Sequence, residues 1–124
     1  MTQNNKPHIL VVEDDAHHRT LINHQLKDKY NLTFAVDAID GARALQKPID
    51  LALIDIFLGS NGTGMDFLDH MKSNGSSHIK TIALTAQGAK EDRQKYLDHG
   101  FDDYIPKPYN RVELIEGIER QLKK

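Results

Sequence analysis

Cysteine is absent from the 124 residues, which excludes disulfide bridges, thiolate nucleophiles and zinc sites with thiolate ligands. No apolar run approaches the roughly 20 residues that would span a bilayer, and the polar first residues lack the apolar core of a signal peptide. Lys and Arg are scattered along a chain of net charge −2, so no basic patch indicates nucleic acid. We therefore expect a cytoplasmic protein with neither a membrane nor a direct nucleic-acid partner.

The length and composition are those of one globular domain. Hydrophobic residues make up 39% of the chain and charged residues 27%, and 124 residues are enough to bury a core. We expect residues 1–7 to form a polar N-terminal tail and residues 8–124 to form the domain.

Short apolar runs alternate with amphipathic segments along the chain. Continuous β-branched runs predict strands buried on both faces, and apolar residues three or four positions apart predict helices. The expected strands are 8–12, 32–36, 50–55, 79–84 and 101–105, and the expected helices are 16–29, 38–46, 65–71, 88–99 and a last one capped by Asn110. Because each parallel crossover needs a helix, this alternation predicts a three-layer α/β fold with a parallel sheet.

The expected helices differ in how much apolar surface they offer. Leu21, Ile22 and Leu26 predict a buried stripe on the first helix. The stripe of the last helix is expected to contain Val112, Leu114, Ile115, Ile118 and Leu122. Segment 88–99 has few apolar residues, so we expect that helix to be loosely held.

Polar side chains follow four of the five expected strands. In parallel sheets ligands bind beyond the carboxyl ends of the strands, so these side chains should converge. They are Glu13, Asp14, Asp15, Asp55, Thr85 and Lys107. Crowded carboxylates call for a proton or a cation, and Mg²⁺ prefers such oxygen ligands. An ammonium beside them suits a phosphoryl group, and one carboxylate can then act as nucleophile.

Plainer interpretations apply to several of these acids. Asp55 can simply end a strand in solvent, and Asp15 suits a helix cap better than a metal ligand. Asp102 and Asp103 are expected to form a solvated turn. Most of the seven histidines fall on expected helices, and we expect no functional role for them.

Five segments in order carry a family resemblance. They are residues 9–15, residues 38–45, Asp55 with Leu58, Thr85-Ala86, and residues 100–108. Together they resemble the receiver domain of two-component response regulators over essentially the whole chain. The resemblance implies a flavodoxin-like (βα)5 fold, a doubly wound parallel five-stranded sheet with strand order 2-1-3-4-5.

The resemblance also implies roles for individual residues. Asp55 matches the aspartate that accepts a phosphoryl group from a histidine kinase or histidine phosphotransfer protein, in a Mg²⁺-dependent step. The implied metal ligands are Glu13, Asp14, Asp55 and the backbone carbonyl of Phe57. The implied partners of the phosphoryl group are Thr85 and Lys107, with Ala86 controlling access of water, Tyr104 acting with Thr85 as a switch, and Lys107-Pro108 forming a cis peptide bond.

The implied function is signalling rather than turnover of an outside substrate. Such a protein catalyses only its own phosphorylation and dephosphorylation, and the switched face of the fourth helix, fifth strand and fifth helix controls an unknown downstream protein. Gly59 stands where the family usually has proline, and the loop to Gly64 is one residue longer than is common, which suggests a more mobile loop. Two alternatives stay open: a receiver-like docking module that works without phosphorylation, and a Mg²⁺-dependent phosphatase acting through Asp55.

Overall fold

The sheet has five parallel strands in the order β2-β1-β3-β4-β5, as expected. A computed structural model of the chain describes residues 6–56, 63–85 and 90–124. The strands are β1 (His8–Val12), β2 (Asn31–Ala35), β3 (Leu51–Asp55), β4 (Lys80–Thr85) and β5 (Asp103–Pro106). The helices are α1 (Ala16–Leu26), α2 (Ala38–Ala44), α3 (Gly64–Ser73), α4 (Lys90–His99) and α5 (Arg111–Leu122).

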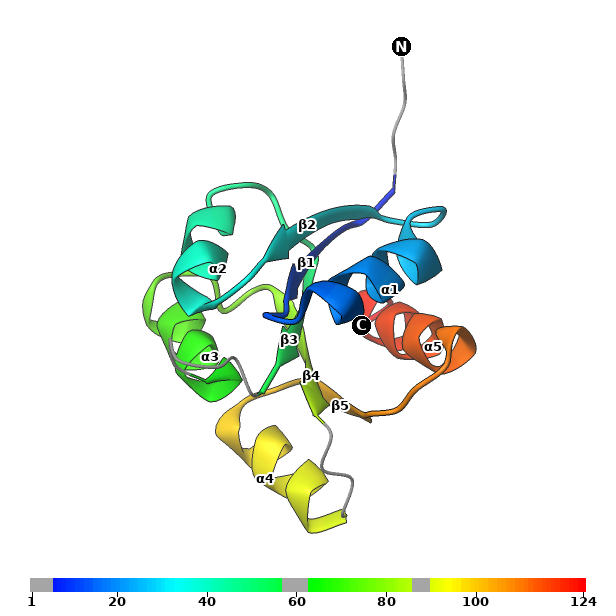
Figure 1. Ribbon diagram of the computed structural model, residues 1–124. Coiled ribbons are helices and arrows are strands. Elements are labelled where there is room, and N and C mark those ends of the chain that lie inside the picture. Colours follow the sequence, from blue (N-terminus) through cyan, green and yellow to red (C-terminus); the bar gives the residue numbers. More distant parts are fainter. Residues whose placement is uncertain (1–5, 57–62, 86–89) are drawn as a thin grey trace.

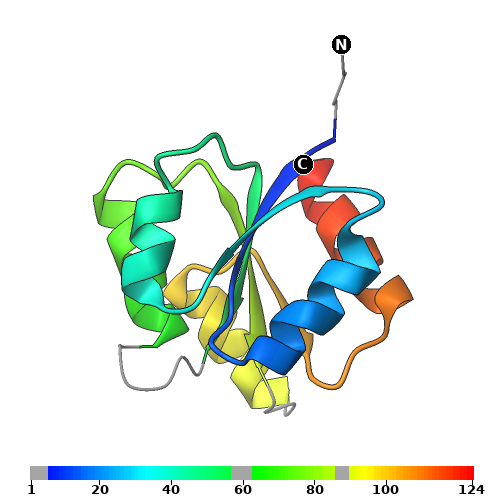
Figure 2. The same ribbon diagram turned by 45° about the horizontal axis from the view of Figure 1, so that its top comes forward.

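Helices cover the sheet on both faces, which gives three layers. Figure 1 shows α1 and α5 on one side of the sheet and α2 and α3 on the other, and Figure 2 shows the same arrangement from a second direction. In β1, Ile9 and Val11 pack toward α1 and α5, whereas Leu10 and Val12 pack toward α2 and α3. All four side chains are fully buried, so the continuous apolar run of β1 is explained by burial on both faces.

Side-chain caps begin α1, α2, α3 and α5, and those of α1 and α5 were predicted from the sequence. Asp15 accepts hydrogen bonds from the backbone N–H groups of His17 and His18, so Asp15, and not Asp14, is the cap of α1. Asn110 and Glu113 form a capping box at the start of α5. The predicted cap role of both Asp15 and Asn110 is confirmed.

Two residues predicted to be buried are exposed. Leu21 is 45% exposed, because Ile22 and Leu26 alone turn the narrow apolar stripe of α1 toward the sheet. Val112 is 60% exposed, because it lies in the first turn of α5, ahead of the buried stripe that begins at Leu114. Helix α1 also ends at Leu26, three residues earlier than expected, and β5 begins at Asp103 rather than at Phe101.

Among the described side chains of helix α4, Tyr96 makes the main contact with the core. Tyr96 is 1% exposed and packs with Phe101 and Tyr104, its ring stacked on Tyr104 at 5.6 Å between centroids. The described part of α4 contributes no other fully buried side chain, which agrees with the expected poverty of its apolar face. Gly59, residues 86–89 and residues 1–5 of the predicted tail lie outside the described residues.

Candidate functional site

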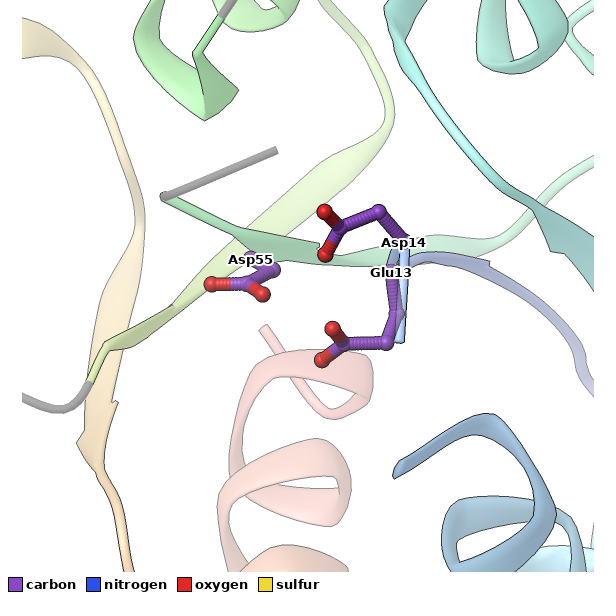
Figure 3. A group of neighbouring side chains, drawn as sticks. All are labelled: Glu13, Asp14 and Asp55. Carbon is purple, nitrogen blue, oxygen red and sulfur yellow. The ribbon is translucent and has the colours of Figure 1, made fainter. Parts of the chain in front are cut away.

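Three carboxylates meet at the carboxyl end of the sheet. Strand β1 stops at Val12, so Glu13 and Asp14 lie in the turn before α1, and Asp55 is the last residue of β3. One oxygen of each acid lies within 4.8 Å of the others (Figure 3). Glu13 and Asp55 are buried and Asp14 is exposed, so the cluster is open to solvent on the Asp14 side.

Lys107 contributes a positive charge to this cluster. Its Nζ lies 3.2 Å from Glu13 Oε1 and 3.4 Å from Asp55 Oδ2. The Lys107 backbone N–H donates to the carbonyl of Thr85 at 2.7 Å, and the peptide bond to Pro108 is cis. This hydrogen bond holds Lys107, the residue after β5, against the end of β4, so that its ammonium lies next to the acids.

Glu13 is the acid most affected by its surroundings. Burial raises its pKa to about 7, with added contributions from its hydrogen bond to Asp55 and from the Asp55 charge, while Lys107 and the backbone N–H of Asp15 act in the opposite direction. Its side chain is 1% exposed. The raised pKa means that Glu13 holds a proton more readily than an ordinary glutamate does.

Of the remaining predicted residues, the structure describes Thr85 and Tyr104. Thr85 is fully buried at the end of β4. Leu84, the residue before Thr85, pairs with Asp55 in the register of β3 and β4. Tyr104 is 8% exposed and stacks on Tyr96 of α4. Phe57 and Ala86 lie outside the described residues.

The donor set fits a hard cation. All three acids present oxygen atoms, and the described residues add no histidine or sulfur ligand to the group. Mg²⁺ prefers oxygen ligands and keeps several waters when few carboxylates reach it. An ammonium 3.4 Å from Asp55 is also placed to pair with an anionic oxygen of a group bound to that carboxylate.

One predicted turn proved to be a buried ionic contact. Asp103 is 5% exposed, and its carboxylate accepts hydrogen bonds from Arg120 and Gln121 of α5 and lies 3.8 Å from Arg93 of α4. Asp102 is exposed, but its Oδ2 accepts a 2.8 Å hydrogen bond from the N–H of Thr81. The prediction of a solvated turn is therefore wrong for Asp103. Its charge is buried among partners on α4 and α5, which are distant in sequence.

Comparisons with known proteins agree with this geometry. A family model described as the response regulator receiver domain matches residues 9–119. The phosphate regulon transcriptional regulatory protein PhoB of Escherichia coli (strain K12) is 35% identical over 119 residues, which cover 94% of this chain and 52% of that protein. The transcriptional regulatory protein CpxR of the same strain is 33% identical over 117 residues, covering 94% and 49%. The chain thus spans about half the length of the curated relatives it matches.

The fold is shared with solved structures. A CheY-like response regulator receiver domain protein from Methanospirillum hungatei JF-1 is 28% identical, with a TM-score of 0.85 over 96% of this chain and 95% of that one.

Proposed function

Because the chain belongs to the receiver domain family of two-component response regulators, we propose that it acts in phosphorelay signalling by accepting a phosphoryl group on Asp55. The observation that carries this proposal is the placement of Asp55. Its buried carboxylate ends a central strand, beside two further acids and 3.4 Å from the Lys107 ammonium. We assign the roles of nucleophile, cation ligands and phosphoryl partner to these neighbouring side chains.

The proposed reaction forms an acyl phosphate. An oxygen of Asp55 attacks the phosphorus of the donor, the bond between phosphorus and the donor breaks, and its electron pair leaves with the donor group. Mg²⁺ bound by Glu13, Asp14 and Asp55 would neutralise the acids and the charge on the phosphoryl oxygens. Lys107 would keep its position and exchange its contact with Asp55 for a phosphoryl oxygen.

The same change of charge would reach the face formed by α4, β5 and α5. We assign Thr85 to the phosphoryl group as a hydroxyl partner and Tyr104 to the response, since Tyr104 stacks on the one fully buried side chain described in α4. A helix with such a small apolar contact can shift at low cost. Phe57, through its backbone carbonyl, and Ala86, as a residue controlling water, complete the proposed site.

The proposed partners are proteins. The donor would be a histidine kinase or a histidine phosphotransfer protein, and the receiver of the signal a downstream protein that binds the α4-β5-α5 face. PhoB and CpxR are named as transcriptional regulators, so we limit the proposed absence of direct nucleic-acid contact to this domain. Among the described residues no helix is long and apolar enough to cross a membrane. A cytoplasmic location is part of the proposal because we place the kinase reaction there.

Intact-mass measurement after incubation with acetyl phosphate and Mg²⁺ tests the proposal. We expect one added phosphoryl mass, lost in the presence of a chelator and in Asp55→Asn. Asp28→Asn is the matched control, because Asp28 is an exposed acid that follows α1 at the other end of the sheet.

The outcomes separate the proposal from the two other functions. The comparisons favour neither of them. Absence of both added mass and phosphate release from folded protein would indicate a docking module that works without phosphorylation. Repeated turnover of a simple phosphate ester through Asp55 would indicate a phosphatase. Labelling that persists in Asp55→Asn would move the phosphoryl group to another residue.

A further inference from the structure

A cavity of about 470 Å³ adjoins the acidic site on the side of α1 and α5. We call it the α1–α5 cavity and define it by its lining residues, His18, Leu21, Lys107, Pro108 and Tyr109. Its volume lies in the range of roughly 300–1,000 Å³ that is typical of sites for small molecules. The function described above makes no use of His18, Leu21 or Tyr109.

The walls of this cavity are mainly apolar, although it lies next to a charged site. Leu21 projects from α1 with 45% of its surface exposed, and Pro108 and Tyr109 follow the cis peptide bond after β5. His18 Nδ1 is buried, makes no hydrogen bond with the described residues and lies 3.7 Å from Glu13 Oε1, so it is a polar atom on the side of the cavity that faces the acidic site. The exposure of Leu21, unexpected for a stripe residue, is explained by its place in this wall.

Two observations connect the cavity with the phosphoacceptor. Lys107 lines the cavity while its Nζ contacts Asp55 Oδ2 at 3.4 Å, so one side chain belongs to both. Burial raises the pKa of the Tyr109 hydroxyl, and the charges of Glu13 and Asp55 raise it further, which means that Tyr109 lies within electrostatic reach of both acids. A molecule held by Lys107 through its phosphoryl group would therefore have an apolar cavity beside it.

We propose that the α1–α5 cavity holds the leaving group of a small-molecule phosphoryl donor and favours acyl phosphates whose acyl group carries an apolar ring. This subsite rests on the phosphoacceptor function of Asp55. Leu21, Pro108 and Tyr109 would contact the ring, and Lys107 would hold the phosphoryl oxygens at the mouth of the cavity.

The reaction balances without a further reagent. An Asp55 oxygen bonds to phosphorus, the bond between phosphorus and the acyl oxygen breaks, and its electron pair leaves on a carboxylate. For benzoyl phosphate the product is benzoate, and for acetyl phosphate it is acetate. The two donors differ in the ring and share the reacting bond, so their comparison isolates the contribution of the ring.

The test measures the apparent second-order rate of Asp55 labelling by intact mass with each donor, at fixed Mg²⁺. Burying about 60 Å² of a ring at about 25 cal/mol per Å² corresponds to a rate ratio of roughly tenfold in favour of benzoyl phosphate. The variant Leu21→Asn should reduce this ratio to about twofold or less, because it replaces an apolar wall by an amide of similar size. Dividing the ratio of the variant by that of the wild type removes the intrinsic reactivity of each donor.

Ile39→Asn is the matched control. Ile39 is 58% exposed on α2 and does not line the cavity, so the same substitution on a helix surface should leave the ratio unchanged. A wild-type ratio near one, or an equal ratio in wild type and Leu21→Asn, would overturn the subsite while leaving the phosphoacceptor function intact. Absence of both labelling and phosphate release with either donor, from folded protein, would overturn the phosphoacceptor function itself, and the subsite with it.

Discussion

Gly64 provides the sharpest test of how the strand that carries Asp55 is held. It is the first residue of α3 and is buried, and its N–H donates to the carbonyl of Ile56 at 2.9 Å. A Cβ at this position would lie 2.5 Å from the backbone oxygen of Asp55 and 2.9 Å from Ile54 Cγ2. The start of α3 therefore packs directly on the backbone of the phosphoacceptor, and Gly64→Ala should disturb both.

The expected cost follows from what the new methyl group meets. Extra methyl groups in a packed interior cost about 1–3 kcal/mol, and here the nearest atom is backbone, which cannot rotate away. We therefore expect the free energy of unfolding to fall by about 3 kcal/mol. A helix that tolerated the methyl group would gain up to about 1 kcal/mol from the better propensity of Ala, so the two cases differ in sign.

Gly117→Ala is the control for this substitution. Gly117 lies within α5, and its Cβ would lie 2.8 Å from Ile105 Cδ1, the free end of a side chain. That methyl group can move, so the gain in propensity and the packing cost should nearly cancel, with a net change within about 1 kcal/mol.

Urea unfolding of the three proteins measures the difference. Equal denaturant slopes would show that the same surface is exposed on unfolding, so the midpoints can be compared directly. Labelling of Asp55 by acetyl phosphate should also be slower in folded Gly64→Ala, because the end of β3 is displaced. Equal stability of wild type and Gly64→Ala, or a larger loss in Gly117→Ala, would refute this account of the packing.

Three further predictions concern charged groups. In the presence of a chelator, the free energy of unfolding should fall by about 3 kcal/mol between pH 5 and pH 8. The reason is that the pKa of Glu13 is raised to about 7, so the folded protein binds more protons than the unfolded protein in this window. Urea titrations should show that this fall is largely abolished in Glu13→Gln. Lys107→Ala removes a cation that competes for Glu13 and Asp55, so calorimetry should show Mg²⁺ binding several-fold more tightly, and unchanged affinity would contradict this. Asp103→Asn should lower the free energy of unfolding, measured in urea, by about 1–3 kcal/mol, because the Asp103 charge is buried with partners on two helices. Asp102→Asn should lower it by less, and a larger loss for Asp102→Asn would contradict this reasoning.

Much of the fold follows from local patterns in the sequence. The run Ile9–Val12 lacks alternation because both faces of β1 are covered, and the same pattern located the other buried strands. Asn110 and Glu113 specify the start of α5 within four residues of chain. Such features depend on neighbours in sequence, and this is why they could be predicted from sequence alone.

Several features that were predicted wrongly or not at all depend on partners distant in sequence. Aspartate is common in turns, and this is why a turn was predicted at Asp103. Its charge is buried because Arg120 and Gln121 of α5 donate hydrogen bonds to it. Leu21 fits the apolar stripe of α1, yet Ile22 and Leu26 face the core and Leu21 lies in the wall of a cavity. Gly64 was placed in a mobile loop, whereas it packs against the backbone of Asp55.

The sequence by itself determined which residues end the strands, and therefore that Glu13, Asp14, Asp55, Thr85 and Lys107 would share one edge of a parallel sheet. Strand order, register and the hydrogen bond from Lys107 to Thr85 decided the distances between them: the Lys107 ammonium lies 3.2 Å and 3.4 Å from two of the acids, and one oxygen of each acid lies within 4.8 Å of the others. Periodicity is a property of neighbouring residues and survives in the sequence. Distance and burial arise from packing between elements, and so the raised pKa of Glu13 and the α1–α5 cavity are products of the tertiary structure.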